Sequence, residues 1–236
     1  MGRCAGGVAV KEHPILFSGP LVRAILEGRK SQTRRLAKFV PLDDGVNLGF
    51  SGLSVGQYNT GDLSSGAVLY SRGAGGVWNQ RTKPLRYYAL PGQTLWVRET
   101  WQSLHHNGVR TVYRADGEDP RTGWDDVPAE QRPPMTWRPS IFMRRADSRI
   151  SLEVTGVRVE RLHAITEEDA KAEGVTTSFH GCITIDGKSG PGTIHTFGPD
   201  ARVKAFGVLW EAINGKRAPW VSNPWVWVVE FRRVQR

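Results

Sequence analysis

The sequence predicts an α+β protein that is mainly β, a small closed or nearly closed β-barrel with short peripheral helices and long loop insertions. Segments with the period-two or continuous apolar pattern of strands outnumber those with helical periodicity. The helical segments are short, which suits a barrel with helices on its outside. With 236 residues, of which 39% are hydrophobic, the chain can bury one core. We therefore expect one domain over residues 1–236, with insertions at about 43–92, 116–139 and 177–199.

The first predicted elements are a strand at residues 14–17 and the helix that follows it. Pro20 favours a helix start at this point, because proline suits the first helical position. Gly28 is the natural helix stop, and residues 32–37 leave the turn as a second strand. One face of the helix is apolar through Leu21, Val22, Ile25 and Leu26.

The three insertions have the composition of loops. Residues 43–92 contain ten glycines and few clustered apolar residues, with short strands expected near 68–70 and 85–88. Residues 116–139 are acidic and hold five prolines, which predicts a surface excursion. Residues 177–199 form a second glycine-rich loop.

Two further strands are predicted at residues 94–101 and 110–114. By the period of two, Glu99 lies on the face of its strand that otherwise looks like core. A buried carboxylate needs a cationic partner, and Arg98 points to the opposite side of the strand. We therefore expect Glu99 to pair with an arginine or lysine from elsewhere in the chain.

The C-terminal part alternates strands and helices. The apolar phase of a strand at residues 150–159 slips at Gly156, which predicts a β-bulge. Thr166 and Asp169 have capping-box spacing and open a short helix that Gly174 ends. The closing strand at 225–231 is nearly all apolar and should be central in the sheet. Before it, Asn214-Gly215 ends a helix whose apolar stripe is Phe206, Leu209, Trp210 and Ile213.

The net charge indicates the class of partner, and the cysteine content indicates the cellular compartment. A formal net charge of +9 favours an anionic partner such as a nucleotide or nucleic acid, although a merely basic surface would give the same balance. No apolar run approaches the roughly 20 residues of a membrane span, so no membrane partner is expected. The apolar stretch within residues 1–10 is too short for a signal peptide. Two distant cysteines, Cys4 and Cys182, fit a reducing cytoplasm.

Lys30 and Thr33 are the leading candidates for chemistry. A threonine hydroxyl becomes a nucleophile when a base takes its proton. A lysine can be that base if burial or neighbouring positive charge lowers its pKa, and Arg29, Arg34 and Arg35 supply such charge. The alternative is that Lys30 is a solvated turn residue and Thr33 an ordinary strand former.

Glu173 is the next candidate, because it lies in the last turn of a short helix. The helix dipole disfavours a negative charge there, so this glutamate has either a cationic partner or a functional role, unless it is simply solvated. Aromatic residues could stack a base against an arginine, or could fill the core: Trp96, Trp101, Tyr113, Trp137 and Trp225.

No metal and no cofactor are expected from the motifs. The sequence contains no Walker loop and no Gly-x-Gly-x-x-Gly. No metal-ligand spacing links the histidines and cysteine considered for a metal site, which are His105, His106, His180, Cys182 and His195.

The order of several sequence blocks resembles that of ASCH domains, which have a PUA-like barrel. The opening blocks are Pro14-Ile15-Leu16-Phe17 and Gly28-Arg29-Lys30-Ser31-Gln32-Thr33-Arg34. The further blocks are residues 94–101, 137–140, 150–162, 167–174 and 223–227. The pattern is most similar to the longer ASCH proteins of bacteriophages and prophages, which implies a bacterial host cytoplasm.

The resemblance implies an activity as well as a fold. A small ASCH enzyme is an amidohydrolase that removes the acetyl group from N4-acetylcytidine. Its Gly-Arg-Lys-x-x-Thr segment is similar to that around Lys30 and Thr33, and its helical glutamate is best matched by Glu173. The resemblance thus implies that Thr33 attacks or orients a water, Lys30 activates it or steadies the oxyanion, and Glu173 moves a proton. The residues expected to contact substrate are Arg29, Arg34, Arg35, Trp96, Arg98 and Glu99.

The sequence is also compatible with two other functions. Other ASCH proteins are thought to bind or cut RNA, so a PUA-like RNA- or DNA-binding module, with or without ribonuclease activity, is the main alternative. The basic pairs Arg34-Arg35, Arg144-Arg145 and Arg232-Arg233 favour it. A phage accessory protein that uses exposed tryptophans for protein contacts is a third reading. This chain is over twice as long as the small enzyme, and its insertions could reshape the pocket.

Overall fold

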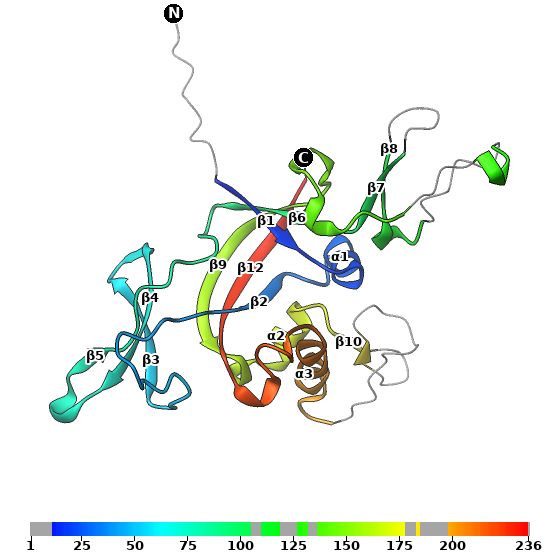
Figure 1. Cartoon of the computed structure of the whole chain (residues 1–236). Coiled ribbons are helices and arrows are strands. Elements are labelled where there is room, and N and C mark those ends of the chain that lie inside the picture. The colour runs from blue at the N-terminus through cyan, green and yellow to red at the C-terminus, as the bar shows by residue number, and fades with distance from the viewer. Residues whose placement is uncertain are drawn as a thin grey trace, which may run out of the picture.

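A five-stranded mixed sheet organises the computed structural model, which describes residues 11–104, 110–118, 127–131, 136–177, 183–184 and 198–235. The strand order is β1-β6-β9-β12-β2 (Figure 1). β1 and β6 are parallel, and the other neighbours are antiparallel. The bounds are β1 (Glu12–Leu16), β2 (Gln32–Leu36), β6 (Thr94–Arg98), β9 (Ser151–Arg161) and β12 (Trp225–Val234). The predicted α+β, mainly β class is therefore confirmed.

β12 has partners on both sides and separates two hydrophobic cores. Trp225, Trp227 and Val229 point into the larger core, which we call the inner core. Val226 and Val228 point to the opposite face, into what we call the helix-side core. Burial on both faces explains the continuous apolar run of this strand, and the central position predicted for it is confirmed.

The predicted bulge in β9 is also present. The register against β12 shifts between Glu230, which faces Gly156, and Phe231, which faces Val154. One residue of β9 is therefore left over at this point, as the slip in apolar phase requires.

Three α-helices pack on the sheet. α1 (Gly19–Leu26) begins with Pro20 in its first turn and buries its apolar stripe against the inner core. α2 (Glu167–Ala172) begins at Thr166, whose side chain and that of Asp169 form the predicted capping box. α3 (Ala201–Asn214) begins earlier than its apolar stripe and packs with α2 on the helix-side core (Figure 1). No helix in the described part of the chain is long and apolar enough to span a bilayer.

The sheet is open, so the closed form of the predicted barrel is wrong. β1 and β2 are its two edges, and no backbone ladder joins them among the described residues. The start of β2 is instead joined to the end of α2, through an isolated bridge between Lys30 and Glu173. A side chain spans the remaining gap, since Arg35 Nη2 donates to the Leu16 carbonyl at 2.6 Å.

The insertion at residues 43–92 is more ordered than its composition predicts. It holds a three-stranded sheet of β3 (Leu53–Asn59), β4 (Asp62–Arg72) and β5 (Trp78–Gln80). The strand expected near 68–70 is the centre of β4, whereas the one near 85–88 is reduced to a single bridge between Leu85 and Ala67. Leu53, Ala67 and Leu69 belong to the inner core, and this burial offsets the many glycines.

The expected strand at residues 94–101 is broken at Glu99. β6 ends at Arg98, and Trp101 begins a separate hairpin of β7 (Trp101–Leu104) and β8 (Arg110–Tyr113).

β10 (Thr176–Thr177) and β11 (Ile183–Thr184) form a small pair. Short 3-10 turns cover Ala74–Gly76, Arg114–Asp116, Ala129–Gln131, Ser140–Phe142, Arg145–Asp147, Leu162–Ala164 and Trp220–Ser222. Most of the insertion at 177–199, and residues 119–126 and 132–135 of the excursion, lie outside the described residues.

Candidate functional site

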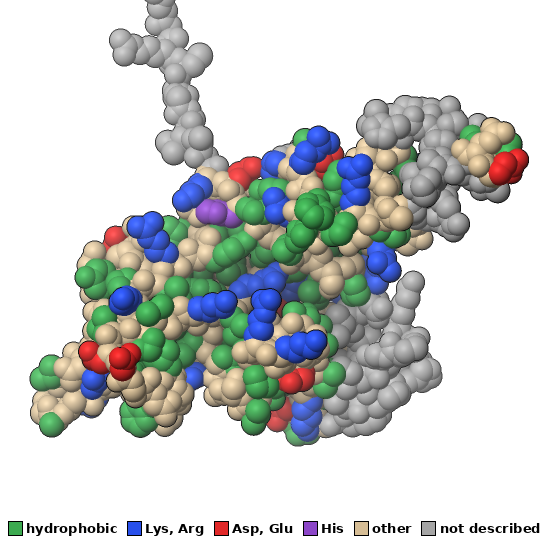
Figure 2. Space-filling model, in the orientation of Figure 1, with side chains coloured by type: hydrophobic (Ala, Val, Ile, Leu, Met, Phe, Trp, Pro, Cys, Tyr) green, Lys and Arg blue, Asp and Glu red, His purple; other side chains and the backbone are tan. Residues whose placement is uncertain are grey.

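A cavity of about 380 Å³ lies at the open gap of the sheet, between the end of β1, β2, the end of α2 and one face of α3. This volume is within the range of small-molecule sites. Figure 2 shows Lys and Arg side chains gathered in the middle of this face of the molecule. Lys30, Thr33 and Glu173 all line the cavity, together with Arg34 and Arg35.

The turn between α1 and β2 fixes the position of Lys30. Gly28 has a left-handed backbone (φ 73°), as a helix C-terminus requires. The amides of Arg29 and Lys30 then both donate to the carbonyl of Ala24. Lys30 is left only 4% exposed, which excludes the alternative of a solvated turn lysine.

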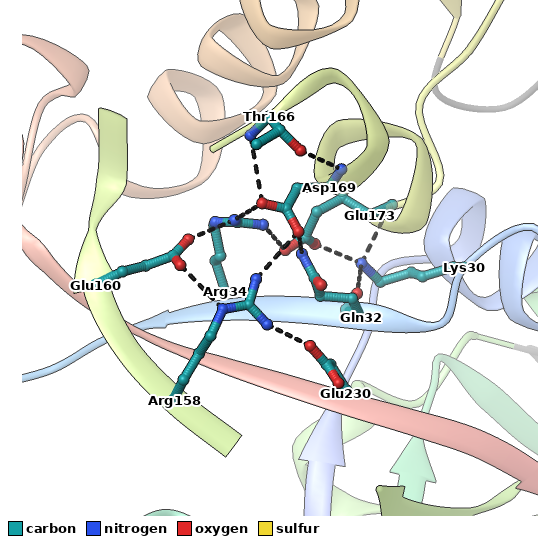
Figure 3. Close-up of polar contacts among 9 residues, drawn as sticks. All are labelled: Lys30, Gln32, Arg34, Arg158, Glu160, Thr166, Asp169, Glu173 and Glu230. Atoms are coloured by element: carbon teal, nitrogen blue, oxygen red, sulfur yellow. Dashed lines mark hydrogen bonds and ion pairs between the residues drawn. The ribbon is translucent and has the colours of Figure 1, made fainter. Parts of the chain in front are cut away.

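The Lys30 ammonium has one acceptor for each of its three N–H groups. Nζ donates to Glu173 Oε2 at 2.7 Å, to the Gln32 carbonyl at 2.7 Å and to the Glu173 carbonyl at 2.9 Å (Figure 3). Burial lowers the pKa of Lys30, and the neighbouring Glu173 carboxylate opposes this shift without cancelling it. The neutral amine is therefore easier to reach than in a surface lysine.

Glu173 lies at the C-cap of α2 and is 3% exposed. Its Oε2 accepts from Lys30, and its Oε1 accepts from Arg34 Nη1 at 3.3 Å. Two cations thus offset the unfavourable position of a carboxylate at the negative end of the helix dipole. The cationic partner expected from the sequence is present, and the alternative of a solvated glutamate is excluded.

Arg34 connects β2 to α2 and β9 on the helix side of the sheet. It lies opposite Val228 of β12, and its side chain has no exposed surface. Besides Glu173 it binds Glu160 at 2.6 Å and Asp169 at 2.9 Å. A guanidinium with this many carboxylate partners is held in a fixed plane.

A second arginine, which is partly exposed, extends this network. Arg158 contacts Glu160 and Asp169, each at 3.0 Å, and also pairs with Glu230 (Figure 3). Burial acts to raise the pKa of Asp169, but the charges of Arg34 and Arg158 and the hydrogen bond from Gln32 together hold that pKa below its usual value. Asp169 therefore stays ionised, and its contacts with Arg34 and Arg158 hold α2 against β2 and β9.

Thr33 lies on the opposite face of β2, next to Val229 of β12, and is 4% exposed. The residue is part of the cavity lining. Among the described residues, its hydroxyl has no hydrogen-bond partner, whereas the amine of Lys30 is fully engaged. The hydroxyl is thus free to meet a ligand in the cavity.

The other residues predicted to contact substrate are divided between this cavity and other places. Arg35 lines the cavity, and its guanidinium lies 5.2 Å from the ring centre of Phe17. Arg29 lies outside it, where it pairs with Glu27 and donates to the Gly174 carbonyl. Trp96 is buried under the guanidinium of Arg98, 4.6 Å from its ring centre, and does not line the cavity.

Glu99 is paired with Arg149, so the predicted cationic partner of this buried carboxylate is confirmed. The two groups meet in a bidentate contact of 2.9 and 3.0 Å, and Arg149 also binds Asp116. Burial raises the pKa of Glu99 more than Arg149 lowers it. The pair lies outside the cavity lining and ties the break between β6 and β7 to the turn before β9.

The wall formed by α3 was missed by the sequence reasoning. Phe206, Leu209, Trp210 and Ile213 line the cavity, although their helical spacing predicts only a packed face. The aromatic residues considered for base stacking lie elsewhere: Trp101 and Trp225 are buried in the structure, and Tyr113 packs against Arg149. Trp137 does not line the cavity.

No group of three His, Cys, Asp or Glu side chains is arranged to hold a metal in the part of the chain that the structure describes. The residues considered for a metal, His105, His106, His180, Cys182 and His195, lie outside the described residues. Comparisons with protein-family models, with curated proteins and with solved structures find no match.

Proposed function

We propose that the chain is an amide hydrolase that removes the acyl group from N4 of a cytosine nucleoside or a related modified base. The observation that carries this proposal is the meeting of Lys30, Thr33 and Glu173 at one cavity, although 143 positions separate the lysine from the glutamate. These are the residues that the sequence resemblance matches to an N4-acetylcytidine amidohydrolase.

We further propose that the open sheet is a PUA-like fold of the ASCH type, in a phage or prophage protein of the bacterial cytoplasm. The resembling blocks fall on β1, the α1–β2 turn with the start of β2, β6, residues 137–140, β9, α2 and the start of β12. All five strands of the central sheet are thus covered, and the insertions lie outside it.

The proposed reaction begins at the unpaired hydroxyl of Thr33. The neutral amine of Lys30 takes the hydroxyl proton while Oγ1 attacks the acyl carbon. The C–N bond then breaks, the proton passes to the leaving amine, and the acyl group stays on Thr33 as an ester. A water molecule cleaves that ester, which releases the carboxylic acid and restores the hydroxyl.

The contacts of Lys30 favour proton transfer over binding of the oxyanion. In the ammonium form all three N–H groups already have protein acceptors, so none is left to donate to a substrate oxygen. Glu173 Oε2, at 2.7 Å from Nζ, is close enough to exchange a proton with the amine. This pair can hold the proton between its removal from Thr33 and its delivery to the leaving nitrogen.

The cavity also suits the rest of such a substrate. Phe17 on one side and Phe206 and Trp210 on another give apolar and aromatic surface for a base. Arg34 and Arg35 add positive charge beside the reacting group. A pocket with an apolar wall and a few convergent polar groups is typical of a small-molecule site.

The direct test is the release of acetate and cytidine from N4-acetylcytidine by the purified protein. Thr33→Val removes the hydroxyl and keeps the branched shape, and we expect it to lower kcat at least about 100-fold. Lys30→Met, which removes the amine and keeps the length, should do the same. Thr111→Val in β8 and Lys171→Met on the exposed side of α2 are matched controls that should stay within about twofold.

A second readout separates lost chemistry from lost folding. Circular dichroism and thermal unfolding should show that Thr33→Val is folded, because valine is favoured in strands. In the unaltered protein, rapid acid quenching and mass spectrometry should find acetyl on the peptide that contains Thr33. If the unaltered protein does not deacylate N4-acetylcytidine or its phosphorylated forms, or if Thr33→Val is as active as the parent, the proposed function is wrong.

A further inference from the structure

A second cavity of about 330 Å³ adjoins the first across Arg35. Leu16, Arg35 and Leu36 line both cavities, so the two meet at the gap between β1 and β2. The contact between Arg35 and the Leu16 carbonyl forms part of the boundary between them. The two cavities are thus neighbours, and Arg35 lies between them.

Three arginines line this second cavity. They are Arg35 from β2, Arg98 from the end of β6 and Arg86 from the segment after the inserted sheet. Among the described residues that line it, none is acidic. The cavity is therefore strongly positive, in contrast to the first one, where Glu173 offsets part of the charge.

These arginines differ from three others that pack near the sheet. Arg34, Arg149 and Arg158 each bind two or three carboxylates. Within the part of the chain that the structure describes, Arg35, Arg86 and Arg98 form no ion pair, although Arg35 and Arg98 are half-buried. Removing positive charge from water costs free energy, which a bound anion would offset; the charge of Glu173 offsets part of this cost at Arg35.

The existing contacts orient two of the guanidinium groups and leave donors free. Arg35 lies over the ring of Phe17 and uses Nη2 for the Leu16 carbonyl. Arg98 lies over the ring of Trp96 and uses Nη1 for the Ile141 carbonyl at 3.3 Å. Each arginine has five N–H donors in a planar fork that matches phosphate oxygens, so both keep donors for such a group.

We propose that the second cavity binds a phosphate of the substrate, so that the chain acts on a nucleotide or a nucleic-acid strand in preference to a free nucleoside. The inference rests on the proposed function, since the acylated base would occupy the first cavity. The sugar would pass Arg35, and the phosphate would lie among Arg35, Arg86 and Arg98.

The test compares three substrates: N4-acetylcytidine, its 5′-monophosphate, and a short single-stranded RNA with one N4-acetylcytidine. We expect kcat/KM to be at least about tenfold higher for one or both phosphate-bearing substrates. A gain with the monophosphate identifies a terminal phosphate as sufficient, and a gain confined to the RNA identifies the phosphodiester strand. Equal values for all three substrates would overturn the inference and leave the proposed hydrolase intact, whereas no turnover of any would overturn the hydrolase.

Variants of the arginines give two readouts, a ratio of kcat/KM values and a binding affinity that does not need catalysis. Arg86→Gln and Arg98→Gln should each lower the ratio of kcat/KM between the phosphate-bearing substrate and the nucleoside several-fold. They should also weaken binding of unmodified cytidine 5′-monophosphate, or of the unmodified RNA, in a calorimetric titration. Arg72→Gln in β4, an exposed arginine outside both cavities, is the control of equal charge change. Unchanged ratios and affinities in both cavity variants would refute a phosphate site here.

Discussion

At the scale of single residues, the proton on Lys30 is subject to two opposed influences. Removal from water favours the neutral amine, whereas Glu173 and two backbone carbonyls stabilise the ammonium. Because burial is the larger effect, the pKa of Lys30 is below its ordinary value of 10.5. A lysine in this state can act as a base under milder conditions than a surface lysine can.

The pH dependence of deacylation follows from this balance. If Lys30 must be neutral to accept the proton of Thr33, kcat/KM should rise with pH to a plateau, with the midpoint of the rise below 10.5. Glu173 raises the pKa of Lys30, so Glu173→Gln should move the midpoint of the remaining activity to lower pH. Measured pH–rate profiles of the two proteins test this, with Glu168→Gln on the exposed side of α2 as control. A midpoint that is unchanged or higher in Glu173→Gln would contradict the proposed role of Lys30.

The residues with local sequence signals were the ones that sequence reasoning could find. Lys30 follows a helix-stop glycine, and Glu173 occupies a helix end where an acid is unusual. Arg86 carries no such signal, because its place at a cavity depends on how the inserted segment returns to the sheet. The lining of a cavity is set by contacts between distant segments, which periodicity along one element does not encode.

At the scale of elements, α2 is a short helix held by charge as well as by packing. It has six residues, so its own hydrogen bonds are too few to stabilise it in isolation. Asp169 closes the capping box with Thr166 and also binds Arg34 and Arg158. This one carboxylate therefore links the start of the helix to β2 and β9.

Asp169→Asn should destabilise the protein in a pH-dependent way. The pKa of Asp169 is lowered on folding, so its contribution is complete above its ordinary pKa of 3.8 and is lost as the pH falls through the lower folded value. At pH 7 we expect a loss of about 2 kcal/mol in the free energy of unfolding, from charged hydrogen bonds and the cap. Urea unfolding measured from pH 2 to 7 checks this expectation.

Glu168→Gln, in the same helical turn but exposed, should change stability by less than about 0.5 kcal/mol. If Asp169→Asn costs as little as Glu168→Gln at pH 7, or costs as much at pH 2 as at pH 7, the buried network does not hold α2 as described.

The helices and strands were easier to predict from the sequence than the way in which the strands pair. The apolar alternation, the capping box and the slip at Gly156 are local, and each gave an element or feature that the structure contains. The break after Arg98 was missed because it depends on Arg149, fifty positions beyond Glu99. The open sheet was missed because alternation looks the same in an edge strand as in a closed barrel.

At the scale of the whole molecule, the candidate site occupies the place where the sheet fails to close. β1 and β2 need backbone or side-chain partners along their facing edges. Arg35 and the end of α2 supply some of them, and the two cavities occupy the space between. Closing the barrel would remove the site, so the proposed function requires that the edges of β1 and β2 stay unpaired.

The inserted sheet adds to the same core, which predicts cooperative unfolding of the described chain. Leu69 in β4 has no exposed surface and packs within the inner core, which also contains residues of β9 and β12. Leu69→Ala should therefore lower the free energy of unfolding of the whole protein by about 2–5 kcal/mol, as expected for a fully buried leucine. The control Val77→Ala, whose side chain is mostly exposed, should cost less than about 0.5 kcal/mol.

Urea unfolding followed by tryptophan fluorescence and by amide hydrogen exchange measures this coupling. Because Leu53, Ala67 and Leu69 belong to the inner core together with residues of the central sheet, both probes should report one transition, and Leu69→Ala should shift it without splitting it. If β3, β4 and β5 instead exchanged their amide hydrogens in a separate, earlier step that alone responded to Leu69→Ala, the insertion would be an independent unit. Glycine-rich composition would then have been the better guide than burial, and the single domain would have to be divided at residues 43–92.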